Sequence, residues 1–375
     1  MGATTMSSLI PKHDFVGIEE VAHLAAGGET PALRAHIDAT GRFLRDKTAG
    51  MPGRERMYLV AARVKERLAR MLSRKADEIA FLFNASEGIF VAANGIEWRP
   101  GDNVVTALSE FPSVRGAWDH SRALEVRVVD KGLVPTLDEL RAAVDRRTRI
   151  IAISHVSYLT GARWDLNALR EIADAVGARL VVDASHSLGV IPVDAGLCDV
   201  VVSCCYKWMF GAHGVGVFFV NSDRWPDLGP PWMGWHSIEP NSDRGRTNRY
   251  RMKDSMERFE SGNYSFVSLY LLDTGLAALE RVGISSIEKH VLALGDRLCD
   301  ELKRLGCDVL TPTEPAMRAG NIAIAAKDSE RLEEELRAAG VLTWAGDGRL
   351  RLSVHAYNDE SDVARAASAM RSITL

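Results

Sequence analysis

The sequence predicts an α/β fold with a large domain on a mainly parallel, seven-stranded sheet and a small α+β domain at the C-terminal end. Short β-branched runs alternate with amphipathic segments of about ten residues, which is typical of a parallel sheet covered on both faces. The length of 375 residues exceeds what one hydrophobic core usually fills. We therefore expect an N-terminal arm (1–25), a large domain (26–255) and a small domain (256–375).

Each element of the large domain is expected from its local periodicity. Two helices come first, and strands and helices then alternate up to a closing pair of strands. The expected helices are 32–48, 54–72, 85–96, 113–121, 136–143 and 167–176. The expected strands are 78–84, 103–107, 125–129, 149–154, 179–183, 198–203 and 215–220.

The two ends of the chain have different patterns. The arm contains one short helical pattern, at 18–25. Far from the arm, near the end of the large domain, a charged segment at 243–254 is expected to be exposed and mobile. The C-terminal part mixes helices and strands, which predicts the α+β domain. Its expected helices are 266–281, 285–305, 329–339 and 360–370, and its expected strands are 321–325 and 349–353.

Composition excludes several classes of protein. Hydrophobic residues make up 46% of the chain and charged residues 26%, which is ordinary for a globular enzyme and argues against disorder. The net charge of −4, spread along the chain, predicts neither a nucleic-acid partner nor a membrane surface. Five cysteines without paired spacing predict reduced thiols and no metal site, so we expect a cytoplasmic protein.

The strongest chemical signal is a pair of charged residues at strand ends. Asp183 closes the run Arg-Leu-Val-Val-Asp, and Lys207 follows the run Val-Ser-Cys-Cys-Tyr. Open α/β sheets bind ligands beyond the carboxyl ends of their strands, where both side chains are expected. Each residue also has an ordinary interpretation, Asp183 as a helix cap and Lys207 as a surface lysine.

Two further segments contain candidates for an anion site and a flat apolar surface. Ala85 and Ser86 open a predicted helix directly after a strand, where free backbone N–H groups can hold a phosphate. The same residues are equally compatible with plain helix capping. Phe111 follows the strand at 103–107 and can stack on a planar ring or pack in the core.

Together these segments resemble the class V branch of fold-type I pyridoxal-phosphate enzymes, which includes cysteine desulfurases, kynureninase, isopenicillin N epimerase-like proteins and class V aminotransferases. The resemblance extends from about residue 25 to the C-terminus. Asp183 and His186 precede Lys207 by 24 and 21 positions, similar to the family's Asp-x-x-Gln/His segment and lysine. The resemblance implies pyridoxal 5'-phosphate as cofactor, with Lys207 forming the Schiff base, Asp183 pairing with the ring nitrogen and His186 approaching the phenolic oxygen.

Other family motifs imply the remaining cofactor contacts. Ser203 or Cys204, next to Tyr206 and Lys207, would hold the phosphate together with Ala85 and Ser86. The segment Phe-Glu-Ser-Gly-Asn ending at Asn263 is similar to one that reaches the phosphate of the neighbouring subunit. The resemblance therefore implies a homodimer with shared active sites.

Three residues are implied to face the substrate. Arg351 stands six positions before a Tyr-Asn pair and matches the family's carboxylate-binding arginine, a role that suits a planar guanidinium. Tyr158 is the fourth residue of a His-Val-Ser turn similar to the family's, where desulfurases commonly show Asn. Trp235 lies in a Gly-Trp segment similar to one near the pocket of relatives.

The sequence departs from the desulfurases at one motif, and this difference narrows the range of expected reactions. Their nucleophilic cysteine lies on a loop before the arginine, and residues 340–348 contain none, which disfavours a persulfide-forming desulfurase. Tyr206 stands where desulfurases show His and kynureninase-like members show Tyr. We expect an aminotransferase acting on an amino-acid-like substrate, with a C–S or C–C lyase and an epimerase as alternatives. A non-catalytic module of a transcription regulator is disfavoured, because no helix-turn-helix precedes the fold.

Overall fold

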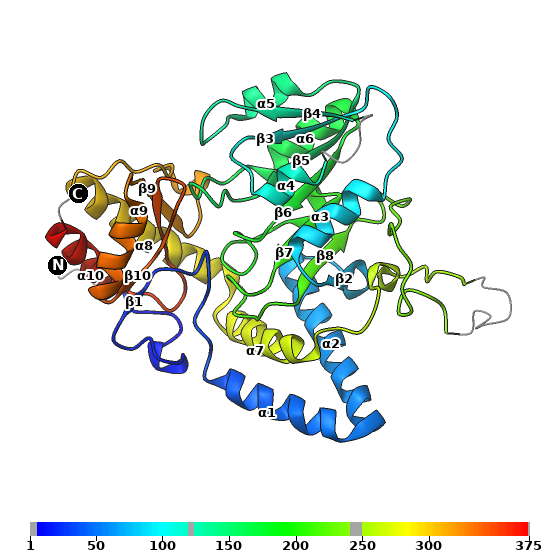
Figure 1. The fold of residues 1–375 in the computed structure, drawn as a ribbon, viewed down its shortest axis with the longest axis horizontal. Helices are drawn as coiled ribbons and strands as arrows, with labels where there is room; N and C mark the ends of the chain where they lie inside the picture. The colour runs from blue at the N-terminus through cyan, green and yellow to red at the C-terminus, as the bar shows by residue number, and fades with distance from the viewer. Residues whose placement is uncertain (1–5, 119–123, 241–249, 374–375) are drawn as a thin grey trace.

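The computed structural model describes residues 6–118, 124–240 and 250–373, and within them a seven-stranded sheet forms the centre of the molecule (Figure 1). Its order is β2-β8-β7-β6-β5-β3-β4. The strands β3 to β7 run parallel, and β8 is antiparallel to both of its neighbours, β2 and β7. The predicted mainly parallel sheet is therefore confirmed. The bounds are β2 (Ile79–Leu82), β3 (Asn103–Ala107), β4 (Glu125–Val129), β5 (Thr148–Ser154), β6 (Arg179–Asp183), β7 (Val200–Cys204) and β8 (Gly216–Val220).

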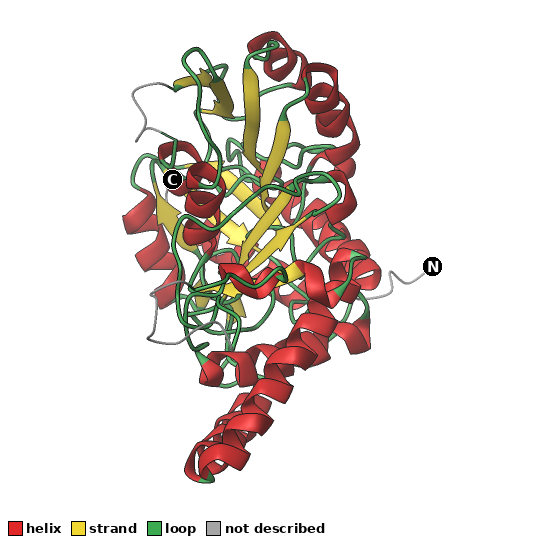
Figure 2. Ribbon diagram, turned by 90° about the vertical axis from the view of Figure 1, so that its right-hand side faces the viewer, coloured by secondary structure: helices red, strands yellow, loops and turns green. Residues whose placement is uncertain are grey.

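Helices cover both faces of this sheet, as Figure 2 shows. Successive side chains of a strand point to opposite faces, so Leu180 and Val182 belong to one buried cluster with residues of α2, α6 and α7, whereas Val181 belongs to another with residues of α3 and α4. Both clusters are apolar and buried, which accounts for the continuous apolar runs in the sequence. The helices are α1 (Ala35–Thr48), α2 (Gly50–Leu72), α3 (Ala85–Asn94), α4 (Pro112–Gly116), α5 (Leu137–Ala143), α6 (Leu166–Val176) and α7 (Phe266–Val282).

A second, antiparallel sheet lies beside the first and has the order β11-β12-β9 (Figure 1). Its strands are β9 (Asn321–Ala325), β11 (Trp344–Gly346) and β12 (Arg349–Ser353), and the helices α8 (Ile284–Arg304), α9 (Ser329–Ala338) and α10 (Glu360–Ser372) belong to the same part of the chain. The N-terminal segment joins this part, because β1 (Ala22–His23) pairs in parallel with β10 (Val341–Leu342). The mixture of helices and strands predicted for the C-terminal part is confirmed.

The helix expected at 18–25 is wrong. The backbone N–H groups of Ala22 and Leu24 donate to the carbonyls of Gly340 and Leu342 at 2.9 and 2.8 Å, so tertiary strand pairing overrides the local helical pattern. The helix expected at 113–121 is shorter, since α4 spans Pro112–Gly116 and residues 119–121 lie outside the described part of the chain. Most of the charged segment at 243–254 also lies outside it.

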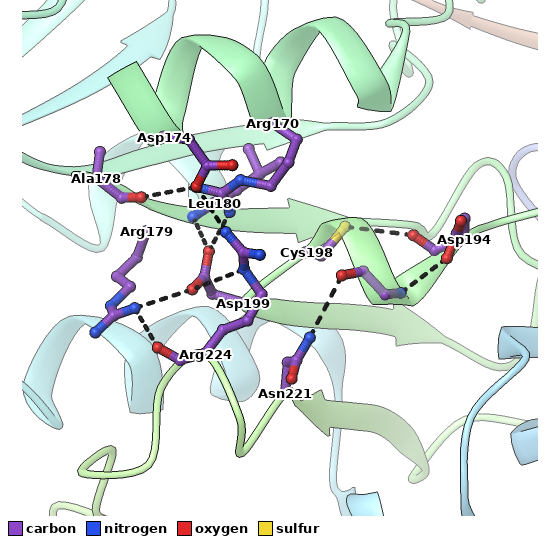
Figure 3. Close-up of polar contacts among 11 residues, drawn as sticks. Arg170, Asp174, Ala178, Arg179, Leu180, Asp194, Cys198, Asp199, Asn221 and Arg224 are labelled. Carbon is purple, nitrogen blue, oxygen red and sulfur yellow. Dashed lines mark hydrogen bonds and ion pairs between the residues drawn. The ribbon is translucent and has the colours of Figure 1, made fainter. Parts of the chain in front are cut away.

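A buried ion-pair cluster lies at the amino-terminal ends of β6 and β7, opposite to the strand ends that carry Asp183 and Lys207 (Figure 3). The Asp199 carboxylate accepts from the Leu180 backbone N–H at 2.7 Å and from Arg170 at 2.6 Å, and its other oxygen accepts from Arg179 at 3.3 Å. Asp199 and Arg170 are both buried. Because each buried charge is compensated by the other, loss of one partner leaves a charge that water cannot reach.

We predict that Asp199→Asn lowers the free energy of unfolding by about 3 to 5 kcal/mol, because Arg170 then loses its buried carboxylate and keeps only the exposed Asp174 as a counter-charge. Urea denaturation measures the change. Asp174→Asn is the matched control, since Asp174 contacts the same arginine at 2.9 Å but its side chain is 56% exposed. The control should cost less than about 1 kcal/mol, and equal losses in the two variants would contradict the prediction.

Candidate active site

A pocket of about 490 Å³, which includes space open to solvent, lies at the carboxyl ends of β5, β6 and β7. Ser154 and Asp183 are paired across the ends of β5 and β6, and Cys204 ends β7 three residues before Lys207. Parallel strands bring their carboxyl ends to one edge, so residues far apart in sequence meet there. The pocket is lined by these residues proposed from the sequence: Ala85, Ser86, Phe111, Tyr158, Asp183, His186, Cys204, Tyr206 and Lys207.

Asp183 is a buried carboxylate facing this pocket. Its Oδ1 accepts from the Ser185 backbone N–H at 2.8 Å, and the Ser185 hydroxyl accepts from the Cys204 N–H at 3.0 Å. Burial raises the pKa of Asp183, an effect that its bonds to Ser185 and the charge of Lys207 partly offset. Within the described residues no cation lies within 4 Å of Asp183, so a positively charged ligand atom would find an uncompensated carboxylate there.

His186 connects Lys207 to the second sheet. Its Nε2 lies 3.2 Å from the Lys207 Nζ, and its Nδ1 lies 2.9 Å from the amide nitrogen of Asn321 at the start of β9. Burial holds the pKa of His186 well below its usual range, so the ring is neutral. Lys207 is thereby in contact with a histidine that is bonded from the other side by Asn321.

The start of α3 forms a possible phosphate site. The Asn84 side chain accepts from the Glu87 N–H at 2.8 Å and caps the helix, while the first turn leaves other N–H groups free for a ligand. Gly88 lets the helix lie against the sheet, because a Cβ there would come within 2.5 Å of Val202 Cγ1. This close contact brings Ala85 and Ser86 to the pocket beside Cys204.

Aromatic rings form the walls of the pocket. The Phe111 and Tyr158 rings meet edge to face with centroids 5.2 Å apart, and the Lys207 Nζ lies 5.9 Å from the centre of the Phe111 ring. Tyr206 stacks on His213 at 4.0 Å, and burial raises its pKa to about 12. A planar ring bound near Lys207 would therefore have flat apolar surfaces beside it.

Arg351 is buried at 3% exposure and lies next to this pocket. Its Nη1 donates to the Tyr158 carbonyl at 2.7 Å, and its guanidinium lies 4.7 Å from the centre of the Trp344 ring. The Nε has no hydrogen-bond partner, and the described residues offer no carboxylate within 4 Å. Burial and the nearby charge of Arg349 lower the pKa of Arg351 to about 10. An anion could satisfy this cation.

Besides Arg351, which lies next to the pocket, three residues proposed from the sequence do not line the pocket in the single chain. Ser203 is fully buried, and its hydroxyl donates to the Cys204 carbonyl at 3.1 Å. Its side chain and that of Cys204 lie on different faces of the sheet, because neighbouring strand residues point to opposite faces. Asn263 accepts from Arg54 at 2.8 Å, and Arg54 also lies over the ring of Trp235, which is 53% exposed. These two residues therefore lie together on the surface.

Sequence reasoning missed three residues that the structure brings to the site. Trp344 covers Arg351, Asn321 contacts His186, and Glu110 accepts from the Ser154 N–H at 2.9 Å and from its hydroxyl. For Asn321 a signal existed, because a polar residue opens an otherwise apolar strand. For Glu110 the signal was its place directly before Phe111, yet nothing local indicates that this carboxyl is buried at 6% exposure.

The buried carboxyl group of Glu110 leads us to predict that the stability of the protein depends on pH. Burial raises its pKa from 4.5 to about 7. Between these values the unfolded chain has released the proton while the folded chain retains it, so a rise in pH favours unfolding. The free energy of unfolding of the wild type should fall by about 3 kcal/mol across this window relative to Glu110→Gln. Urea titrations at several pH values test this, and parallel curves for the two proteins would contradict it.

Comparison with known proteins places the chain in a family. Residues 51–366 match the model for Aminotransferase class-V. A probable cysteine desulfurase of Methanothermobacter thermautotrophicus is 28% identical over 76% of this chain and 74% of that protein. An uncharacterized aminotransferase of Schizosaccharomyces pombe is 28% identical over 83% of this chain and 81% of that protein. The apo structure of a cysteine desulfurase from Thermococcus onnurineus has a TM-score of 0.89 at 21% identity, covering 98% of this chain and 99% of that one.

The fold and the pocket define an enzyme of pyridoxal-phosphate fold type I. The chain belongs to the class V aminotransferase family, and its cofactor is pyridoxal 5'-phosphate. The residues present fit this group, because the buried Asp183 lacks a cation, Lys207 lies in the same pocket, and the start of α3 offers N–H groups for a phosphate. The family includes aminotransferases, desulfurases and lyases, so membership does not decide the reaction.

Proposed function

We propose that the protein acts at the Cα of an amino-acid-like substrate and that its reaction is transamination. The observation that carries the choice of reaction is the hairpin before Arg351. Its turn, Asp347–Gly348, has φ values of 52° and 72° and joins β11 directly to β12. No cysteine stands on this short hairpin, the part of the chain that corresponds to the cysteine loop of desulfurases. Trp344 lies on this hairpin and covers Arg351.

The other cysteines give no alternative nucleophile for a persulfide. Cys204 and Cys205 are buried, and burial raises the pKa of both thiols, which disfavours the reactive thiolate. Cys204 lines the pocket, but its place at the end of β7 suits a contact to the cofactor's phosphate end beside Ser86. This arrangement supports transamination over sulfur transfer.

The proposed roles follow from position and charge. Pyridoxal phosphate supplies an electron sink when bound. Asp183 would keep the ring nitrogen protonated, His186 would contact the phenolic oxygen, and Phe111 would lie against the ring. Arg351 would bind the substrate carboxylate, with Tyr158 holding the guanidinium in place through its carbonyl. Lys207 would carry the cofactor and, as a free amine, move a proton to or from the substrate Cα.

A C–S or C–C lyase is the second candidate. Removal of a proton at Cα also serves elimination, so the same residues support it. The observation that favours it is Tyr206, whose ring lines the pocket, stacks on His213 and keeps its hydroxyl proton because burial raises its pKa. A protonated phenol beside Lys207 could donate a proton to a leaving group. An epimerase would use Lys207 without either transfer or elimination.

The assembly and location are part of the proposal. Asn263 and Trp235 lie outside the pocket of their own chain, which supports a homodimer in which a neighbouring copy completes each site. The five cysteines are free, which supports a cytoplasmic location. None of the helices in the described part of the chain is long and apolar enough to cross a membrane. The division into arm, large domain and small domain at residues 25 and 255 also remains a proposal.

Lys207→Ala should abolish covalent attachment of pyridoxal phosphate, because Lys207 supplies the amine. Borohydride reduction followed by mass spectrometry of the intact chain measures the attachment. Lys253→Ala is the control, since Lys253 is paired with Glu257 at 2.5 Å and should leave attachment unchanged. Failure of the wild type to become labelled would overturn the cofactor role of this pocket.

Product analysis separates the candidate reactions. With single amino acids supplied to the loaded protein, transamination yields the keto acid and the pyridoxamine form of the cofactor. Elimination yields a keto acid and ammonia without that form, and epimerisation yields only exchange of the Cα proton. A keto acid with ammonia in equal amounts would reject transamination in favour of the lyase.

Arg351→Lys should raise KM for the amino acid by about 10- to 100-fold, because an ammonium cannot bind a carboxylate through two parallel N–H groups. Steady-state kinetics with the best substrate measures the change. Arg349→Lys is the matched control on the same strand, because Arg349 is already paired with Asp347 at 3.0 Å. A similar KM for wild type and Arg351→Lys would contradict the assignment of Arg351.

A further inference from the structure

Asn321 lies at the junction of the two sheets and connects them through hydrogen bonds. It opens β9, is fully buried, and places its amide nitrogen 2.9 Å from His186 Nδ1. Its amide oxygen accepts from the Ser353 hydroxyl on β12 at 2.8 Å. Since His186 Nε2 lies 3.2 Å from the Lys207 Nζ, a chain of four side chains leads from the second sheet to the reactive lysine.

The surroundings of Asn321 decide which way its amide points. A Cβ on Gly27 would lie 2.5 Å from the amide oxygen, 2.8 Å from the Ser353 hydroxyl and 3.1 Å from Arg351 Nε, so these atoms converge on one glycine. Arg351 Nε is a buried donor without a partner. The amide oxygen is not bonded to Arg351 Nε, but both lie beside the same glycine, where an oxygen near the cation is favourable and an amide NH₂ group would set donor against donor. The nitrogen therefore faces His186.

The tautomer of His186 follows from this orientation. An amide nitrogen has only hydrogens to offer, so His186 Nδ1 must accept. The ring is neutral and carries one N–H, which then lies on Nε2. Nε2 is the atom that points toward Lys207 and the pocket. His186 thus presents a donor to the space in which the cofactor would be held.

We propose that Asn321, held by Ser353, is a positioning residue that fixes His186 as the Nε2–H tautomer, so that His186 donates to the phenolic oxygen of pyridoxal phosphate. The inference rests on the proposed function for the identity of the acceptor, but not for the tautomer. Without cofactor the Nε2–H faces the Lys207 Nζ at 3.2 Å, and an ammonium cannot accept from it, so the bond to Asn321 alone holds this tautomer there; in the loaded site the phenolate oxygen accepts from it. The Ser353–Asn321 pair therefore holds His186 in the tautomer that can donate to the cofactor when it is bound.

The decisive variant is Asn321→Asp. A carboxylate can only accept, so His186 should move its hydrogen to Nδ1 and turn Nε2 into an acceptor. Histidine-specific nitrogen-isotope labelling distinguishes protonated from unprotonated ring nitrogens by NMR, and His186→Gln identifies the signals by their loss. Thr311→Val is the control, because it removes the 2.8 Å bond to the Ala323 N–H on the same strand without touching His186.

The wild type and Thr311→Val should show hydrogen on Nε2, both without cofactor and after loading. Asn321→Asp should show it on Nδ1, with a shifted visible absorbance of the loaded protein and a half-saturating pyridoxal phosphate concentration raised by about tenfold. If Asn321→Asp fails to fold, Asn321→Ala replaces it and should show a mixture of tautomers. Hydrogen on Nδ1 in the wild type, or on Nε2 in Asn321→Asp, would overturn the proposal.

Failure of the proposed function would give a different result. A wild type that binds no pyridoxal phosphate would remove the phenolic oxygen as acceptor, while the histidine signals of the protein without cofactor would still report the tautomer. A wild type that binds the cofactor but carries hydrogen on Nδ1 would overturn only the role of Asn321.

Discussion

The site is built around buried charges whose partners the protein itself does not supply. Asp183 and Arg351 are 6% and 3% exposed, and neither has an oppositely charged group within 4 Å among the described residues. Such groups are costly unless a ligand compensates them. A cofactor with a cationic ring nitrogen and a substrate with a carboxylate would supply one charge each. The rest of the fold holds these two groups in place, which explains why so much buried structure converges on one small pocket.

Two sheets share this task. The parallel sheet presents Asp183 and Lys207 at neighbouring strand ends, which any doubly wound fold can do. The antiparallel sheet presents Arg351 from β12 and Asn321 from β9, which reach the pocket through Tyr158 and His186. The proposed cofactor end of the site thus depends on strand order in one sheet, and the proposed substrate end depends on how the second sheet lies against it.

Much of the site could be predicted from the sequence, because its motifs are local. The parallel sheet followed from alternating apolar runs, and Asp183 and Lys207 were candidates because each follows an apolar run at a strand end, whereas His186 was implied by the family resemblance. The helix at 18–25 was wrong, because β1 gains its hydrogen bonds from β10, more than 300 residues away. The Ser203 or Cys204 ambiguity could not be resolved from spacing, because the pleat of β7 decides which side chain enters the pocket.

The sequence by itself determined the fold class and the absence of a cysteine before Arg351, since these depend on residue types at short separations, and its resemblance to class V enzymes implied the cofactor. Only the tertiary structure decided that Glu110 and Arg351 are buried, that Trp344 covers the guanidinium and that Asn321 faces His186. These positions depend on contacts between strands that are distant in the chain. At such contacts the burial of a side chain, more than its residue type, decides its protonation state and the direction of its hydrogen bonds. The identity of Asn321 is visible in the sequence, but the hydrogen on His186 that it fixes is a property of the packed sheets.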